Sequence, residues 1–297
     1  MILDYLIGIL IFVFGLCIGS FLNCVIYRLP DESPTGHSDG PATMPAKRAL
    51  GGERSLLRKL QGRSFCPSCK HVLSWKDLAP VFSFIFLCGK CRYCHKKISI
   101  QYPLVEAVTG LVFFLIYYFF ISQGSTVNFT GMKFTVYLNL AFLFYVSSVL
   151  IIIFVYDLKH YIIPDKILFP AIGIAFVYRI FQNLSPVSIG GYFSAALIGS
   201  GFFLFIFLIS GGRWIGFGDV KLAILLGLIL GFPNILAGLF LAFFLGAIIG
   251  IILMIFGKSA GWRIKSEIPF GPFLITGTFI ALFFGNAIIN WYLKFLV

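Results

Sequence analysis

Charged residues are scarce in this sequence. Only 11% of the 297 residues are Asp, Glu, Lys or Arg, whereas 59% are hydrophobic. This is too little charge for the hydrated surface of a water-soluble domain of this length, so the composition excludes a soluble protein. Several uncharged stretches approach the roughly 20 apolar residues that a helix needs to cross a bilayer. We therefore predict an all-α polytopic membrane protein.

The signals of a cleaved leader are also missing. The first apolar stretch has no basic segment before it and no A-x-A site after it, so we expect it to remain as the first transmembrane helix. The sixth stretch is short and ends at Gly231-Phe232-Pro233, so we expect it to be tilted, broken or half-spanning. In all, we predict about eight transmembrane helices, with bounds near 2–27, 103–122, 134–155, 166–183, 190–210, 220–232, 234–256 and 270–295.

Positive charge is concentrated between the first two of these stretches. From Arg28 to Gln101 there are 13 Lys and Arg against 5 Asp and Glu. Lys and Arg flank membrane helices on the cytoplasmic side, so we expect this segment inside and both termini outside. A basic patch can also bind nucleic acid. Beside so many spans, we predict attraction to anionic membrane lipid and no nucleic-acid partner. The later loops that we expect inside are basic too, and they carry Lys159, Lys166, Arg213, Lys258, Arg263 and Lys265.

The chain thus divides into three expected parts. These are a first transmembrane helix (1–27), a basic cytoplasmic domain (28–101), and a transmembrane helical bundle (102–297). Within the cytoplasmic domain, residues 31–61 are rich in Pro, Gly and charge and indicate a loop or linker.

Four of the seven cysteines form two C-x-x-C pairs in the basic segment, Cys66-Pro-Ser-Cys69 and Cys91-Arg-Tyr-Cys94. A two-residue spacer lets one turn aim both sulfurs at a single centre, and two such turns complete a tetrahedral thiolate site suited to Zn²⁺. A reducing cytoplasm disfavours disulfides, and the thioredoxin-like pattern that redox dithiols need is absent. We predict a structural zinc site, because four sulfurs leave no position for a catalytic water. Two potential ligands nearby leave the ligand set open, Cys88 and His71.

Acidic residues are rare in the apolar stretches, and two lie at expected helix ends on the cytoplasmic side. Asp157 ends the third stretch, and Asp219 opens the sixth within Gly216-Phe-Gly218-Asp219-Val-Lys221. Two carboxylates that face one another cannot both ionise at neutral pH. The ionised one can then deprotonate a water while the protonated one polarises a scissile carbonyl. We predict a catalytic pair, with Gly216, Gly218 and Lys221 as a supporting loop. The glycines there would allow a close approach to a substrate strand, or a positive φ.

These acids could also serve a structural or transport role. Asp219 is placed where a carboxylate caps a helix N-terminus, and Asp165 after Pro164 is typical of such a cap. Asp157 is harder to explain in this way, because an acid near a helix C-terminus opposes the helix dipole. An ion-coupled transporter would also carry intramembrane acids, but near mid-bilayer and with an internal repeat that is not found here. An inactive scaffold would tolerate changes at both aspartates.

Taken together, these motifs resemble the type IV prepilin peptidase family of aspartic membrane peptidases. The resemblance covers nearly the whole chain as an ordered series of segments. These are Gly19-Ser-Phe-Leu-Asn23-Cys-Val-Ile-Tyr-Arg28-Leu-Pro30, the two cysteine pairs with Gly89 before the second, Gln101-Tyr-Pro-Leu-Val-Glu106, Asp157, Ile163-Pro164-Asp165, Gly216-Phe-Gly218-Asp219-Val-Lys221-Leu222 and Ile268-Pro-Phe-Gly-Pro272-Phe.

The resemblance implies a location and an activity. It implies a bacterial cytoplasmic membrane enzyme whose catalytic pair is Asp157 and Asp219. It also implies that type IV prepilins and pseudopilins are the substrates, cut at the cytoplasmic face after a leader-terminal glycine. Because the four-cysteine domain is intact, it further implies N-methylation of the new N-terminus with S-adenosylmethionine. The alternative is a peptidase without methyltransferase activity.

The methyl-donor site is less well defined by the sequence. No G-x-G-x-x-G follows a strand, so no Rossmann-type cofactor site is expected. The candidates are Asn23, Arg28, Gly89 and Glu106. Three of them have structural alternatives: Gly89 as a knuckle turn, Arg28 as a topology anchor, and Glu106 as a first-turn acid of the second span.

Overall fold

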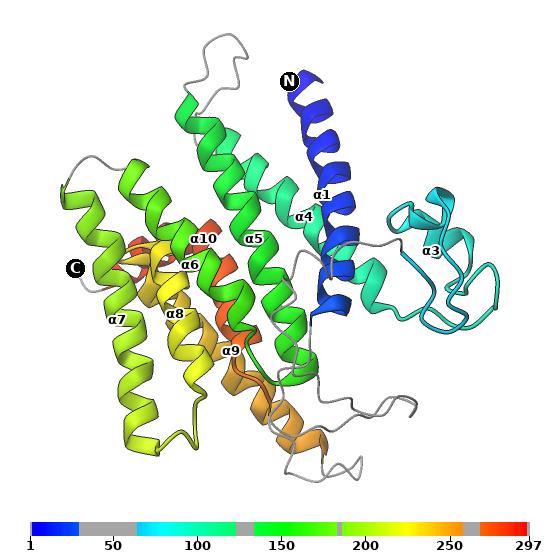
Figure 1. The fold of residues 1–297 in the computed structure, drawn as a ribbon. Coiled ribbons are helices and arrows are strands. Elements are labelled where there is room, and N and C mark those ends of the chain that lie inside the picture. The colour runs from blue at the N-terminus through cyan, green and yellow to red at the C-terminus, as the bar shows by residue number, and fades with distance from the viewer. Residues whose placement is uncertain (1, 30–63, 123–133, 183–185, 258–267, 296–297) are drawn as a thin grey trace, which may run out of the picture. The chain divides into compact units, whose positions relative to one another are not determined.

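The protein is nearly all helical, as the sequence predicts. The computed structural model describes residues 2–29, 64–122, 134–182, 186–257 and 268–295 (Figure 1). Those residues contain no β-sheet, and two isolated β-bridges are found in the cysteine-rich segment. The chain forms two compact units, residues 1–115 and 116–297. The linker predicted at 31–61 lies entirely outside the described residues. The three-part division of the chain stays a prediction.

The first unit joins two long helices to the small cysteine domain. Helix α1 (Ile2–Arg28) packs against the first part of α4 (Gln101–Ser122), and between them in sequence lie η1 (Trp75–Leu78) and α3 (Phe82–Phe86). Glycines set the contact between the two long helices. A Cβ added at Gly15 would lie 2.7 Å from Gly110 Cα, and one added at Gly19 would lie 2.6 Å from Glu106 Cα. Small residues of this kind let helix backbones approach closely in lipid.

The second unit is a helical bundle. After the end of α4 it contains α5 (Phe134–His160), α6 (Asp165–Gln182), α7 (Pro186–Ser210), α8 (Phe217–Leu230), α9 (Asn234–Gly257) and α10 (Gly271–Leu293). Each of these helices begins and ends within about five residues of the bounds that hydropathy predicts.

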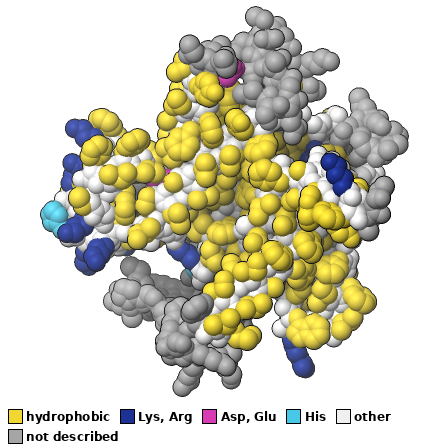
Figure 2. Space-filling view, turned by 180° about the vertical axis from the view of Figure 1, so that it is seen from behind, with side chains coloured by type: hydrophobic (Ala, Val, Ile, Leu, Met, Phe, Trp, Pro, Cys, Tyr) yellow, Lys and Arg dark blue, Asp and Glu magenta, His cyan; other side chains and the backbone are white. Residues whose placement is uncertain are grey.

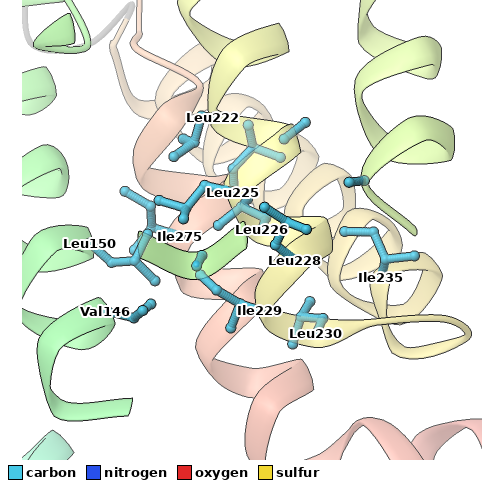
Figure 3. Packing of buried hydrophobic residues seen from close by; sticks show 14 of the residues in the cluster. Val146, Leu150, Leu222, Leu225, Leu226, Leu228, Ile229, Leu230, Ile235 and Ile275 are labelled. Carbon is cyan, nitrogen blue, oxygen red and sulfur yellow. The ribbon is translucent and has the colours of Figure 1, made fainter. Parts of the chain in front are cut away.

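Helix α8 lies in the centre of this bundle. It contacts α6, α7, α9 and α10, and nearly all of its side chains from Asp219 to Leu230 are buried. Figure 3 shows its leucines meeting Val146 and Leu150 of α5 and Ile275 of α10. At Gly227 there is no room for a side chain, because an added Cβ would overlap the backbone of Ala196 on α7. A helix that is apolar on every side is stable when other helices surround it.

Six helices are long and apolar enough to cross a membrane, counting only the described residues: α1, α4, α5, α7, α9 and α10. Helix α8 has 14 residues, fewer than the roughly 20 that a crossing requires. Helix α6 has 18 residues and includes the buried Arg179. The expected number of eight spans is therefore not confirmed. Hydrophobic side chains cover much of the face in Figure 2, as expected of a surface that meets lipid. The chain fits a multi-pass membrane protein.

Candidate functional site: two buried carboxylates and a four-cysteine cluster

The two aspartates singled out in the sequence both lie in the second unit and are both buried. Asp157 is in the last turn of α5 with 4% of its surface exposed, and Asp219 is in the first turn of α8 with 7% exposed. Charged side chains are rarely buried to this extent unless they are paired. The two carboxylates interact with each other electrostatically.

Helix α10 brings a third group to Asp157. The backbone N–H of Gly271, at the start of α10, donates a hydrogen bond to the Asp157 carboxylate. The first N–H groups of a helix have no partner inside it and carry partial positive charge, so they favour an anion. This contact explains how an acid can occupy the last turn of α5, where that helix's own dipole opposes it.

One isoleucine connects the surroundings of the two carboxylates. A Cβ at Gly218, next to Asp219, would lie 3.3 Å from the Ile163 side chain, and a Cβ at Gly271 would lie 3.7 Å from Ile163 Cδ1. Ile163 is itself buried, in the turn between α5 and α6. The end of α5 and the starts of α6, α8 and α10 therefore meet at one end of the bundle.

Asp219 is not the N-cap residue of α8, as the structural alternative would have it, because Gly216 occupies that position and Asp219 lies in the first turn. Its carboxylate accepts the backbone N–H of Gly216, the N-cap residue of α8. The positive φ that we considered for these glycines is wrong. Gly216 has φ −74° and ψ 150°, and Gly218 is not among the positive-φ glycines. Gly218 is needed instead because Ile163 packs against it. Gly216 is exposed, and a Cβ added there would make only ordinary contacts, the nearest at 3.7 Å from Asp219 Oδ2.

The segment predicted as a supporting loop, with Gly216, Gly218 and Lys221, is mostly helical. Gly218 and Lys221 lie inside α8, and only Gly216 precedes it. Lys221 forms an ion pair with Asp165, the first residue of α6. Asp165 therefore links the starts of two helices, in addition to the capping role that the sequence predicts for it. This pair holds the starts of α6 and α8 together beside Asp219.

Sequence reasoning missed Gly271. The segment Ile268-Pro-Phe-Gly-Pro272 is recognisable as a motif, but nothing in it points to a contact with Asp157. The signal available was the Pro272 near the start of a helix, which places the preceding residues at a helix N-terminus. The partner of that N-terminus depends on how α5 and α10 pack, and hydropathy does not report this.

The four cysteines form two turns of the same design in the first unit. In each turn an isolated bridge closes the chain, Phe65 with Val72 and Lys90 with Lys97. In each, the residue after the second cysteine has positive φ, 59° at Lys70 and 55° at His95. The sulfurs of Cys66, Cys69, Cys91 and Cys94 all lie within 4.8 Å of one another.

This cluster fits a tetrahedral metal site. Four sulfurs at about 2.3 Å from one ion lie about 3.8 Å apart, and the Sγ atoms of Cys66 and Cys94 are separated by 3.9 Å. Burial by itself raises the pKa of Cys66, but hydrogen bonds from Cys69, Ser68 and Cys91 together outweigh it and lower that pKa to about 7, which favours a thiolate ligand. The two possible extra ligands lie outside the cluster: Cys88 is exposed, and His71 stacks on Tyr93.

Asp77 stabilises the cysteine domain through hydrogen bonds next to the second cysteine turn. It accepts hydrogen bonds from Arg92 Nε at 2.7 Å, Ser74 Oγ at 2.8 Å and the Tyr93 hydroxyl at 3.2 Å. Burial alone raises the pKa of Asp77, but these donors outweigh it and hold the pKa below its usual 3.8. The ionised carboxylate thus ties η1 to the second cysteine turn.

Three of the four candidates for the methyl-donor site line one cavity in the first unit: Asn23, Arg28 and Glu106. Glu106 is not a first-turn acid, because α4 begins at Gln101 and places it in the second turn, where it is buried. Gly89 does not line the cavity. It has φ +67° and lies against the Phe84 ring, so it serves as a turn of the cysteine domain.

Comparison with known proteins identifies the family. Residues 13–120 match the model of the bacterial peptidase A24 N-terminal domain, and residues 144–251 match that of the type IV leader peptidase family. Several similar curated proteins are named prepilin leader peptidase/N-methyltransferase. That of Aeromonas salmonicida is 30% identical, covering 96% of this chain and 93% of its own length. Those of Legionella pneumophila and Bacillus subtilis are 31% and 28% identical, covering 95% and 96% of this chain and 93% and 97% of their own lengths. No solved structure matches. The chain therefore belongs to the type IV prepilin (leader) peptidase family.

Proposed function

We propose that this protein is an aspartic endopeptidase that removes the leader from type IV prepilins or pseudopilins and then N-methylates the new N-terminus. The observation that carries the peptidase half is the pair of buried carboxylates, Asp157 and Asp219, at one end of the same bundle. The names of its relatives support both halves.

The chemistry of the pair follows from its electrostatics. Two neighbouring carboxyl groups in a buried site share one proton at neutral pH. The ionised group takes a proton from a water, whose oxygen adds to the scissile carbonyl, while the protonated group donates a hydrogen bond to the carbonyl oxygen. The C–N bond then breaks, and the leaving amine takes up a proton. The Gly271 N–H fixes Asp157 for this task, and the exposed Gly216 lets the peptide backbone approach.

We place this site at the cytoplasmic face of the bacterial inner membrane, with the cysteine domain inside and both termini outside. The support is the basic character of the cysteine domain and of the helix ends that flank the turn between α5 and α6, where Lys159 and Lys166 lie. The loop containing Lys258, Arg263 and Lys265 lies outside the described residues.

The four-cysteine cluster is assigned to structural Zn²⁺. The ion would be held by Cys66, Cys69, Cys91 and Cys94 and would fix the two turns of a domain that has little apolar core of its own. S-adenosylmethionine supplies the methyl group when it is bound.

One experiment tests both activities. The purified protein is incubated with a prepilin and isotope-labelled S-adenosylmethionine, and the mass of the mature pilin N-terminus is measured. The proposal expects a product without its leader and heavier by one labelled methyl group. A cleaved but unmodified product would contradict the methyltransferase half, and an uncleaved prepilin would contradict the peptidase half.

A further inference from the structure

The short helix α3 of the cysteine domain has one side turned inward and one side exposed. Phe84 of α3 and Leu87, which follows the helix, line the cavity that this domain shares with α1 and α4. The other side of α3 carries Phe82, Ile85 and Phe86, with 57%, 61% and 82% of their surfaces exposed. Residues three and four positions apart lie on one side of a helix, so these three side chains form a single surface.

The neighbouring helix η1 adds a tryptophan to this exposed side. Helix η1 contacts α3, and its Trp75 is 79% exposed. The Lys76 ammonium lies 5.6 Å from the centre of the Trp75 ring. We call Trp75, Phe82, Ile85 and Phe86 the apolar patch. Exposed apolar side chains that gather in this way mark a surface that meets a partner or a membrane.

The domain that carries the apolar patch is also basic. Between Ser64 and Ile100 there is one acidic residue, Asp77, which is paired with Arg92 inside the domain. The same segment has six basic residues, all exposed: Lys70, Lys76, Lys90, Arg92, Lys96 and Lys97. Positive charge remains in excess even when four thiolates hold one Zn²⁺. The domain is therefore complementary to an anionic partner.

The cysteine domain lies beside the last part of α1, not beyond its end (Figure 1). One cavity is lined both by Phe84 of α3 and by Ser20, which is about 12 Å from the end of α1 at 1.5 Å per residue. The backbone N–H of Val81, directly before α3, donates to the Glu106 carboxylate at 2.7 Å. Glu106 is about 7.5 Å along α4 from its first residue. These contacts fix α3 level with the last turns of α1 and the first turns of α4.

This level corresponds to the edge of the bilayer. Helix α1 has 27 residues and is therefore about 40 Å long, close to the thickness of a bilayer that includes its headgroups. The headgroups occupy roughly 5–7 Å on each side of the hydrocarbon core. Contacts about 7–12 Å from the ends of α1 and α4 therefore lie near the boundary between headgroups and acyl chains. Tryptophan and other aromatic side chains, with Lys and Arg nearby, are typical of segments that lie at this boundary.

We propose that the apolar patch enters the cytoplasmic leaflet of the membrane, while the basic side chains of the same domain bind anionic lipid headgroups. The cysteine domain is then a module that lies in the membrane surface, and not a domain suspended in the cytoplasm. Its partner is an anionic lipid surface. The proposal does not depend on the peptidase or methyltransferase activity.

The test measures the depth of Trp75 in a bilayer. Changing Trp214, Trp262 and Trp291 to Phe leaves Trp75 as the one tryptophan of the full-length protein. The protein is placed in vesicles of phosphatidylcholine mixed with phosphatidylglycerol. Bromine on the lipid acyl chains quenches a tryptophan that it approaches closely, so brominated lipid should reduce the Trp75 fluorescence about twofold or more. Acrylamide dissolved in the water should quench it only weakly.

The opposite pattern would overturn the proposal. Trp75 fluorescence that is unchanged by brominated lipid and strongly quenched by acrylamide would show that the patch lies in water. That result is also expected if the patch binds a soluble protein partner instead of lipid. The zinc content of the variant and its rate of prepilin cleavage, each equal to that of the unmodified protein, check that it is folded.

Two positions on α3 give a matched comparison. All four natural tryptophans are changed to Phe, and a single tryptophan is then introduced by Phe86→Trp in the apolar patch or by Phe84→Trp on the cavity side. Brominated lipid should quench the Phe86→Trp protein at least about twofold more strongly than the Phe84→Trp protein. Equal quenching of two variants that bind zinc normally would overturn the orientation of α3. The measurement on Trp75 does not require either variant to fold.

A third measurement tests the contribution of charge. The protein with Trp75 as its one tryptophan is compared in vesicles of phosphatidylcholine alone and in vesicles that also contain phosphatidylglycerol. Acrylamide should quench Trp75 more strongly in the neutral vesicles, because the basic side chains have no anionic headgroups to bind there. Added salt should increase the quenching in the anionic vesicles only. Equal quenching in both kinds of vesicle would overturn the role given to the basic side chains.

Discussion

Replacing Gly271 by alanine should damage the peptidase without unfolding the bundle. A Cβ at this position would overlap Asp157 Oδ2. The carboxylate would have to turn away, and its hydrogen bond from the Gly271 N–H would be lost. That bond joins a charged acceptor to a helix N-terminus, a position that favours an anion.

The size of the effect follows from the bond that is lost. A hydrogen bond to a charged group contributes about 1.5–3 kcal/mol. At 1.4 kcal/mol per factor of ten, this corresponds to a decrease of about 10–150-fold in kcat/KM for prepilin cleavage. Overpacking by one methyl group costs roughly 1–3 kcal/mol of stability, so the protein should still accumulate.

The assay is the initial rate of leader removal by the purified protein in detergent, with the unfolding temperature measured in parallel. Gly250→Ala is the control, because no atom lies within 4 Å of the Cβ it would add, on α9. This variant should cleave at the unmodified rate. A Gly271→Ala protein that cleaves within about twofold of that rate would refute the argument that this N–H positions Asp157.

Three further outcomes are expected. Metal analysis should find about one Zn²⁺ per chain, and the double change Cys66→Ser with Cys69→Ser should remove it; unchanged metal content would show that these sulfurs are not ligands. Acid should remove the stabilising effect of Asp77, because its lowered pKa stabilises the folded domain only while the carboxylate is ionised. The unmodified protein should therefore unfold at a higher midpoint than Asp77→Asn above about pH 4. This difference in midpoint should disappear as the pH falls through the lowered pKa of Asp77. A gap that is independent of pH would contradict this. The buried Arg179 guanidinium donates hydrogen bonds to the Leu228 and Ile229 carbonyls at the end of α8, and Arg179→Met would leave both carbonyls unpaired. This change should lower the free energy of unfolding by roughly 2–4 kcal/mol and so lower the unfolding temperature. An unchanged unfolding temperature would show that water replaces the guanidinium.

Much of the fold could be predicted from hydropathy, because lipid imposes long apolar helices with charged connections. The short stretch 220–232 was expected to be unusual, and it forms α8. Its central position was not predicted. A leucine that faces lipid and one that faces another helix look alike in sequence, so Leu225 and Leu226 gave no sign that other helices surround them.

The candidate site was predictable where the chemistry is local. The two-residue spacers of the cysteine pairs fix the geometry of each turn, and the cluster of four sulfurs is confirmed. Contacts between distant segments were not predictable in this way. The hydrogen bond from Gly271 to Asp157 and that from Val81 to Glu106 each depend on helix packing, and no spacing rule describes them.

The most direct test of the catalytic pair is prepilin cleavage by Asp157→Asn and by Asp219→Asn, each with the amount of membrane-inserted protein measured. An amide keeps the size of the carboxyl group but can neither take a proton from water nor share one with its neighbour. Each single change should abolish leader removal while the protein accumulates normally. Full processing by both variants would contradict the proposal that these two carboxylates carry out the reaction.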